Sequence, residues 1–147
     1  MKRLEMIMSM DPLSRFVERF IEHPALRERV FAVLQTLPQI VVQDILHDPR
    51  FTMVVYNPEE GQHTSFPIAR PGVGDAGSRM IAWRISLAYA PLDFANYVIA
   101  HEFAHAYLRN RGRTHDEDPE DAADALAAEW GYDKPQSAMR FTWWRRS

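Results

Sequence analysis

The 147-residue chain contains no cysteine, which excludes disulfide bonds, thiol nucleophiles and zinc sites built from cysteine. Any metal ion must therefore be bound by His, Asp or Glu side chains. The chain also lacks a run of about 18 apolar residues, the length that a membrane-spanning helix needs. Its first residues include Glu5 and lack the sustained apolar stretch of a secretory signal. We therefore expect a cytoplasmic protein with no membrane partner.

The chain has no excess of positive charge, since 17 Lys and Arg face 20 Asp and Glu for a formal net charge of -3. This balance argues against a general electrostatic attraction to nucleic acid, and we expect no nucleic-acid partner. The aromatic and basic end, Phe141 to Arg146, could stack on bases, but the negative net charge favours its aromatics packing on the body of the protein. With 46% hydrophobic residues the chain has the composition of a folded globular domain.

Hydrophobic periodicity predicts N-terminal helices within residues 11–37, with Asp11 as N-cap and a break or restart at Pro24. Residues 39–46 fit a short helix or a strand, and residues 51–56 fit a strand. Residues 57–78 collect four glycines and three prolines and predict a long loop, and residues 80–88 alternate as a second strand. We expect one α+β domain over residues 1–147, with its core at about 38–132 and a C-terminal tail at 133–147.

The most distinctive segment is a predicted helix that runs from Asp93, as N-cap, to Gly112 and carries the sequence HExxH. His101 and His105 are four residues apart, so their Cβ atoms lie about 5–6 Å apart on one helix face and both rings can reach one metal ion. Glu102 lies beside them and can accept a proton from a metal-bound water. The alternative interpretation is an amphipathic helix whose histidines lie at the edge of the core.

A catalytic zinc site needs a third protein ligand. Downstream candidates are His115, Asp116, Glu117, Asp118, Glu120, Asp121, Asp124 and Glu129. A final helix is predicted from Asp118–Pro119 to a stop at Gly131, and on it Glu120 and Asp124 share one face because they are four apart. Glu120 can then bind the metal while Asp124 accepts a hydrogen bond from the free ring nitrogen of a histidine ligand. A metzincin is excluded, since it would need Gly and His where Leu108 and Arg111 stand.

These two motifs resemble those of the gluzincin zinc metallopeptidases, in which HExxH is followed on a second helix by a Glu ligand in the form ExxxD or ExxAD. The matching residues here are His101, Glu102, His105, Glu120, Ala123 and Asp124. The order of elements over residues 38–132 is similar to the minimal gluzincin core of ImmA/IrrE-type and SprT-like metalloproteins. SprT-like proteins use a third histidine, which keeps His115 as an alternative ligand.

The resemblance implies a compact zincin-like domain that holds Zn²⁺ through His101, His105 and Glu120, with Asp124 orienting one histidine. It also implies that the strand at residues 80–88 borders the cleft as an antiparallel edge strand that binds an extended substrate. The alternative, which the Ile, Trp and Leu face of this segment favours equally, is an ordinary core strand. The expected function is hydrolysis of peptide bonds by a zinc-activated water with Glu102 as general base. The small size leads us to expect a restricted protein substrate. The alternative is a non-catalytic protein that uses the same zinc site or cleft to bind a partner, although neither metal binding nor folding would require Glu102.

Overall fold

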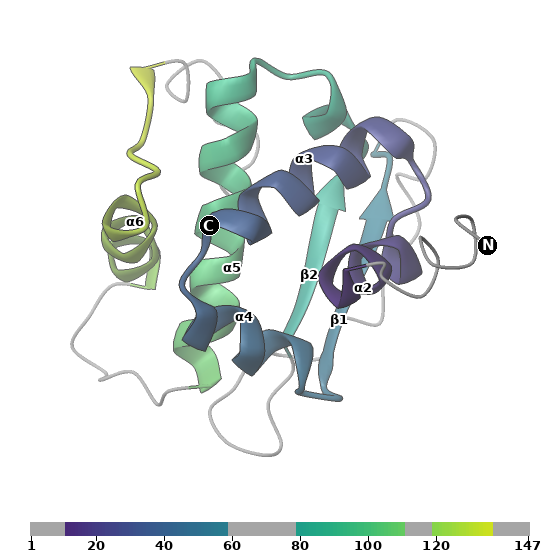
Figure 1. The fold of residues 1–147 in the computed structure, drawn as a ribbon. Helices are drawn as coiled ribbons and strands as arrows, with labels where there is room; N and C mark the ends of the chain where they lie inside the picture. Colours follow the sequence, from purple (N-terminus) through teal and green to yellow (C-terminus); the bar gives the residue numbers. More distant parts are fainter. Residues whose placement is uncertain (1–10, 59–78, 111–118, 137–147) are drawn as a thin grey trace.

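The computed structural model describes residues 11–58, 79–110 and 119–136, and shows an α+β arrangement (Figure 1). His115, nearly all of the predicted loop at 57–78 and the aromatic end of the tail lie outside the described residues. Three helices precede the strands: α2 (Pro12–Phe20), α3 (Pro24–Thr36) and α4 (Gln39–Leu46). The last of these decides the open choice between helix and strand for residues 39–46. Asp11 caps α2, because its side chain accepts a hydrogen bond from the backbone N–H of Leu13 at 3.0 Å.

The two described strands, β1 (Phe51–Tyr56) and β2 (Arg79–Arg84), form a parallel pair in which Phe51 is opposite Arg79. Parallel strands need a connection of a dozen or more residues, and the segment between β1 and β2 is long enough for this. The expectation of an antiparallel edge strand is therefore wrong for β2, whose partner in the described part of the chain runs in the same direction.

The second strand is also shorter than predicted, because residues 85–88 form the 3₁₀ helix η1 (Ile85–Ala88) instead of continuing β2. Alternating apolar residues continue through this turn, so the pattern alone could not show where the strand ends. A tertiary contact holds the turn: the guanidinium of Arg29, on α3, donates to the carbonyls of Leu87 and Ala90 at 2.7 and 2.8 Å.

Helix α5 (Leu92–Asn110) carries the HExxH sequence and contacts α3, α4, α6 and β2. In Figure 1 it stands between α6 and the two strands. It begins one residue before Asp93, so Asp93 lies in the first turn and is not the predicted N-cap. Its carboxylate accepts from the N–H of Phe94 at 2.8 Å and still complements the positive end of the helix dipole. In the described part of the chain, no helix has the length and apolarity to cross a membrane.

The packing of α5 on the sheet decides which way its histidines face. Phe103 is fully buried and stacks on Phe51 of β1 with ring centroids 6.1 Å apart, and it also contacts Trp83 of β2 at 5.6 Å. Residues two apart on a helix point about 200° away from each other. His101 and His105 therefore lie on the face of α5 opposite the strands.

Helix α6 (Pro119–Glu129) packs on α5, and its buried residues are Ala123 and Ala127. Its end is fixed by Gly131, which has φ +100°. The N–H of Tyr132 bonds to the carbonyl of Ala127 at 2.9 Å, and the N–H of Gly131 bonds to that of Ala128 at 3.0 Å. These two bonds form a Schellman motif, so the predicted stop at Gly131 is confirmed.

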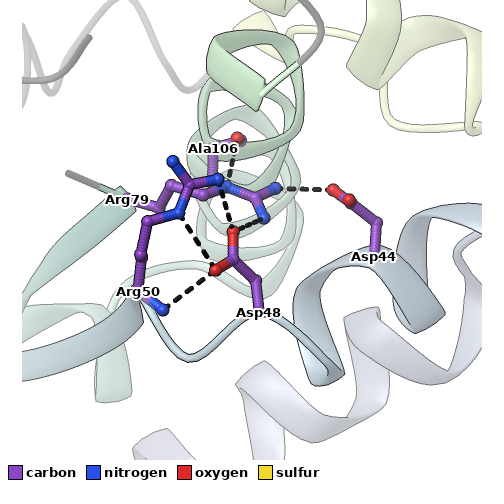
Figure 2. A network of polar contacts seen from close by, with 5 residues as sticks. All are labelled: Asp44, Asp48, Arg50, Arg79 and Ala106. Atoms are coloured by element: carbon purple, nitrogen blue, oxygen red, sulfur yellow. Dashed lines mark hydrogen bonds and ion pairs between the residues drawn. The ribbon is translucent and has the colours of Figure 1, made fainter. Parts of the chain in front are cut away.

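A buried polar network ties α5 to the start of β2 (Figure 2). Arg79 has 1% of its side chain exposed and donates from Nε to the carbonyl of Ala106 at 3.0 Å. Its two terminal nitrogens donate to Asp48 at 2.8 Å and to Asp44, on α4, at 2.7 Å. Arg50 binds the same Asp48 carboxylate at 3.0 Å. Burial alone would raise the pKa of Asp48, but the bonds from the two arginines outweigh it and hold that pKa well below its usual range.

Candidate metal centre

The structure brings together the three side chains predicted as metal ligands. Nε2 of His101 lies 2.9 Å from one carboxylate oxygen of Glu120, and Nε2 of His105 lies 3.0 Å from the other. The two imidazole rings are nearly perpendicular, with centroids 4.6 Å apart. One carboxylate from α6 thus faces two rings from α5, with both Nε2 atoms pointing to the same place.

The predicted orienting role of Asp124 agrees with its position. Its Oδ1 lies 2.8 Å from Nδ1 of His101, so the ring has a carboxylate at each nitrogen. This contact fixes the orientation of the ring and directs Nε2 toward Glu120. The same Oδ1 accepts a hydrogen bond from the hydroxyl of Tyr97, which lies one helical turn before His101.

The carboxylates make this site strongly negative. Burial alone would lower the pKa of His101, but the hydrogen bond with Glu120 and the charges of Glu102, Glu120 and Asp124 outweigh it and raise that pKa above 6.5. The bonds to His101 and His105 hold the pKa of Glu120 well below its usual range. Three carboxylates around two imidazoles leave a negative charge that a divalent cation would compensate.

The spacing of the donor atoms also fits a zinc ion. Two ligands that each lie 2.0–2.1 Å from one tetrahedral zinc are about 3.3 Å apart. The observed distances of 2.9 and 3.0 Å from Glu120 to His101 and His105 need to widen by only a few tenths of an ångström. The histidines are almost completely buried, at 1% and 7% of the side chain exposed, whereas Glu120 is 47% exposed. The protein therefore encloses the histidine side of the site and leaves the glutamate side open to water.

Glu102 lies close to the two histidines. Ligand atoms of His101, Glu102 and His105 all lie within 4.8 Å of one another. This geometric group differs from the predicted ligand set, since it contains Glu102 and omits Glu120. We prefer Glu120 as the third ligand because its two oxygens each contact one histidine directly. The side chain of Glu102 is partly exposed.

One described hollow of the surface lies away from this site. A depression of about 520 Å³ between α2, α3 and α4 is lined by residues that include Leu34, Gln35, Gln39, Val42 and Gln43. None of the lining residues belongs to the histidine site, so the depression gives no support to the metal chemistry.

Comparisons of the chain with protein-family models, with curated proteins and with solved structures found no match. Assignment of a function therefore depends on the geometry of these side chains.

Five residues that the sequence predicts for the site, His101, Glu102, His105, Glu120 and Asp124, lie together in the structure. The alternative ligand His115 lies outside the described residues. The sequence reasoning missed Tyr97, although the signal was present: residues 97, 101 and 105 repeat at intervals of four on one face of the helix. Tyr132, which follows α6 in the sequence, is directed away from the histidines, because its hydroxyl lies 2.5 Å from Oγ1 of Thr36.

Proposed function

We propose that this chain is a zinc metallopeptidase with a zincin-like, gluzincin-type site. The observation that carries the proposal is the convergence of Nε2 of His101 and Nε2 of His105 on the two oxygens of Glu120, a residue on another helix. An HExxH sequence alone can occur on an amphipathic helix by chance. A carboxylate from another helix that contacts both rings, with one oxygen at each Nε2, supports a shared metal site more strongly than the motif alone.

In this proposal His101, His105 and Glu120 hold the zinc ion. When bound, zinc lowers the pKa of a water molecule toward 7 and polarises a carbonyl oxygen. Asp124 holds Nδ1 of His101, which fixes the tautomer with the metal-binding lone pair on Nε2 and increases the basicity of the ring. Any proton on Nε2 of His101 would have to leave for that nitrogen to bind the metal.

Glu102 acts as the general base. It is next to His101 in the chain, it lies within reach of both rings, and no part of the metal-binding set requires a carboxylate there. It accepts a proton from the attacking water and returns that proton to the nitrogen of the leaving amine. The substrate reaches the site from the open side, where Glu120 is half-exposed. We propose a peptide or protein as substrate.

Zinc stoichiometry of purified variants tests the metal centre. Wild type should bind about one zinc, and Glu120→Ala should lose it or bind it far more weakly. Asp121→Ala removes the neighbouring, exposed acid of the same helix turn and is the matched control. His115→Ala tests the alternative ligand: if it loses the metal and Glu120→Ala does not, the third ligand is His115. Wild type without zinc under metal-replete conditions would refute the proposal.

Hydrolysis of a fluorogenic peptide library tests the reaction. Glu102→Gln keeps the shape of the side chain and removes its basicity, so it should retain zinc and lose roughly 10²–10⁴-fold in rate. If zinc is present and neither wild type nor Glu102→Gln cleaves any peptide or unfolded protein, the site binds metal without catalysis and the proposal of a peptidase is wrong.

A further inference from the structure

Tyr97 is a buried polar residue whose position the ligand set does not explain. Its side chain is 1% exposed, and its hydroxyl donates to Oδ1 of Asp124, the oxygen that also contacts Nδ1 of His101. The Tyr97 and His101 rings lie on successive turns of α5, with centroids 5.7 Å apart. A single oxygen of α6 thus receives two donors from one face of α5.

The Tyr97 hydroxyl matters because a single hydrogen bond does not fix the orientation of the Asp124 carboxylate. Asp124 is 26% exposed, so water can compete for its oxygens, and each oxygen has two lone pairs. A donor from a buried ring favours one orientation of the carboxylate. Without the hydroxyl, Asp124 loses a buried donor to the oxygen that contacts His101, and water can take the place of that donor.

We propose that Tyr97 is a positioning residue of the metal centre. It holds the Asp124 carboxylate in the orientation that keeps His101 directed toward Glu120, and it acts on the metal only through these two side chains. The inference rests on the proposed metal function and adds a residue that the motif does not contain. Loss of a partner that orients a histidine ligand weakens metal binding by about 10–100-fold. Tyr97 acts one hydrogen bond further away, so we expect an effect near the lower end, about tenfold.

The experiment compares Tyr97→Phe with Tyr132→Phe. Both variants remove only a hydroxyl that makes a side-chain hydrogen bond, and the partner of Tyr132 is Thr36, which lies outside the site. Zinc affinity is measured by competition with a chelator at fixed neutral pH, and the thermal midpoint of the metal-free protein is measured separately. Tyr97→Phe should raise the zinc Kd about tenfold, whereas Tyr132→Phe should leave it unchanged.

A double-mutant cycle tests the route of the effect. Asp124→Ala should raise the zinc Kd, and adding Tyr97→Phe to it should raise the Kd no further, because the hydroxyl has lost its acceptor. Equal effects of Tyr97→Phe with and without Asp124 would overturn the inference. So would a lowered thermal midpoint with unchanged zinc affinity, since this is the result of a structural role only. If wild type binds no zinc, the metal centre itself is wrong and the inference fails with it.

Discussion

Replacing Arg79 by Met should be among the most destabilising substitutions of a polar residue in this protein. Met approximates the length of the arginine side chain but offers no donor. The substitution leaves the carbonyl of Ala106 and the carboxylate of Asp44 without the bonds that Arg79 donates at 3.0 and 2.7 Å. Asp48 also loses a bond but retains Arg50.

The expected loss follows from burial. Removing one partner of a buried ion pair costs about 3–5 kcal/mol, because the remaining charge is left without compensation. Arg79 is 1% exposed, but Asp44 and Asp48 are 19% and 10% exposed and can recover part of their hydration. We therefore expect a loss at the lower end, about 3 kcal/mol. For a chain of this length this corresponds to a fall of roughly 6–12 °C in the thermal midpoint.

The assay is urea unfolding followed by tryptophan fluorescence, with Arg50→Met as the matched control. Arg50 binds the same Asp48 carboxylate but is 28% exposed, so its loss should cost less than about 1 kcal/mol. Adding Asp44→Leu to Arg79→Met removes one of the carboxylates that Arg79 binds and should restore about 1 kcal/mol or more. Equal costs for Arg79→Met and Arg50→Met, or no recovery with Asp44→Leu, would show that the buried network does not carry the stability assigned to it.

Three further predictions concern acid, the end of α6 and the metal. The pKa of Asp48 is lower in the folded protein than its ordinary value of 3.8. The ionised Asp48 carboxylate therefore stabilises the fold above about pH 4, and this stabilisation is lost as the pH falls further. The urea midpoints of wild type and Asp48→Asn should accordingly converge on acidification. Gly131→Ala should cost about 1–2 kcal/mol in the same assay because φ is +100°, although the added Cβ would meet no atom within 4 Å; an unchanged midpoint would contradict this. Zinc at about 100 times its Kd should raise the free energy of unfolding by about 2.7 kcal/mol in calorimetry, and Glu120→Ala should abolish this increment. Zinc affinity should fall as the pH drops through the raised pKa of His101, because protons then compete with zinc for the ring.

The sequence predicted most of the fold where local signals were strong. Asp11 followed by Pro12, and glycine at 131, are signals for helix ends that depend on a few neighbouring residues, and both were correct. The predicted extent of β2 was wrong because the alternation continues through residues 85–88, where the chain turns and Arg29 of α3 binds the turn. The parallel direction of the strands could not be read either, since strand direction depends on how the intervening chain returns to the sheet.

The site was predictable for a similar reason. The spacing in HExxH and in the pair Glu120 and Asp124 reports which side chains share a helix face, so the grouping within each helix follows from sequence alone. That the two faces meet follows from packing: Phe103 faces the strands and turns the histidines toward α6. The burial of Arg79 has no comparable signal in the sequence, because an arginine after a glycine-rich segment is typical of an exposed position. Its burial depends on Asp44 and Asp48, which come from another part of the chain.

The two anchored positions of α5 lie on either side of its histidines. Tyr97 is hydrogen-bonded to Asp124 of α6, and the carbonyl of Ala106 is bonded to Arg79 of β2. These two positions are nine residues apart in sequence, about 13–14 Å along the axis, and both His101 and His105 lie between them. A helix held at one point could rotate or slide relative to α6, but one held at two points through different neighbours has little freedom to do so. The rings are therefore directed at Glu120 in the structure, which would reduce the ordering cost of forming the proposed metal site.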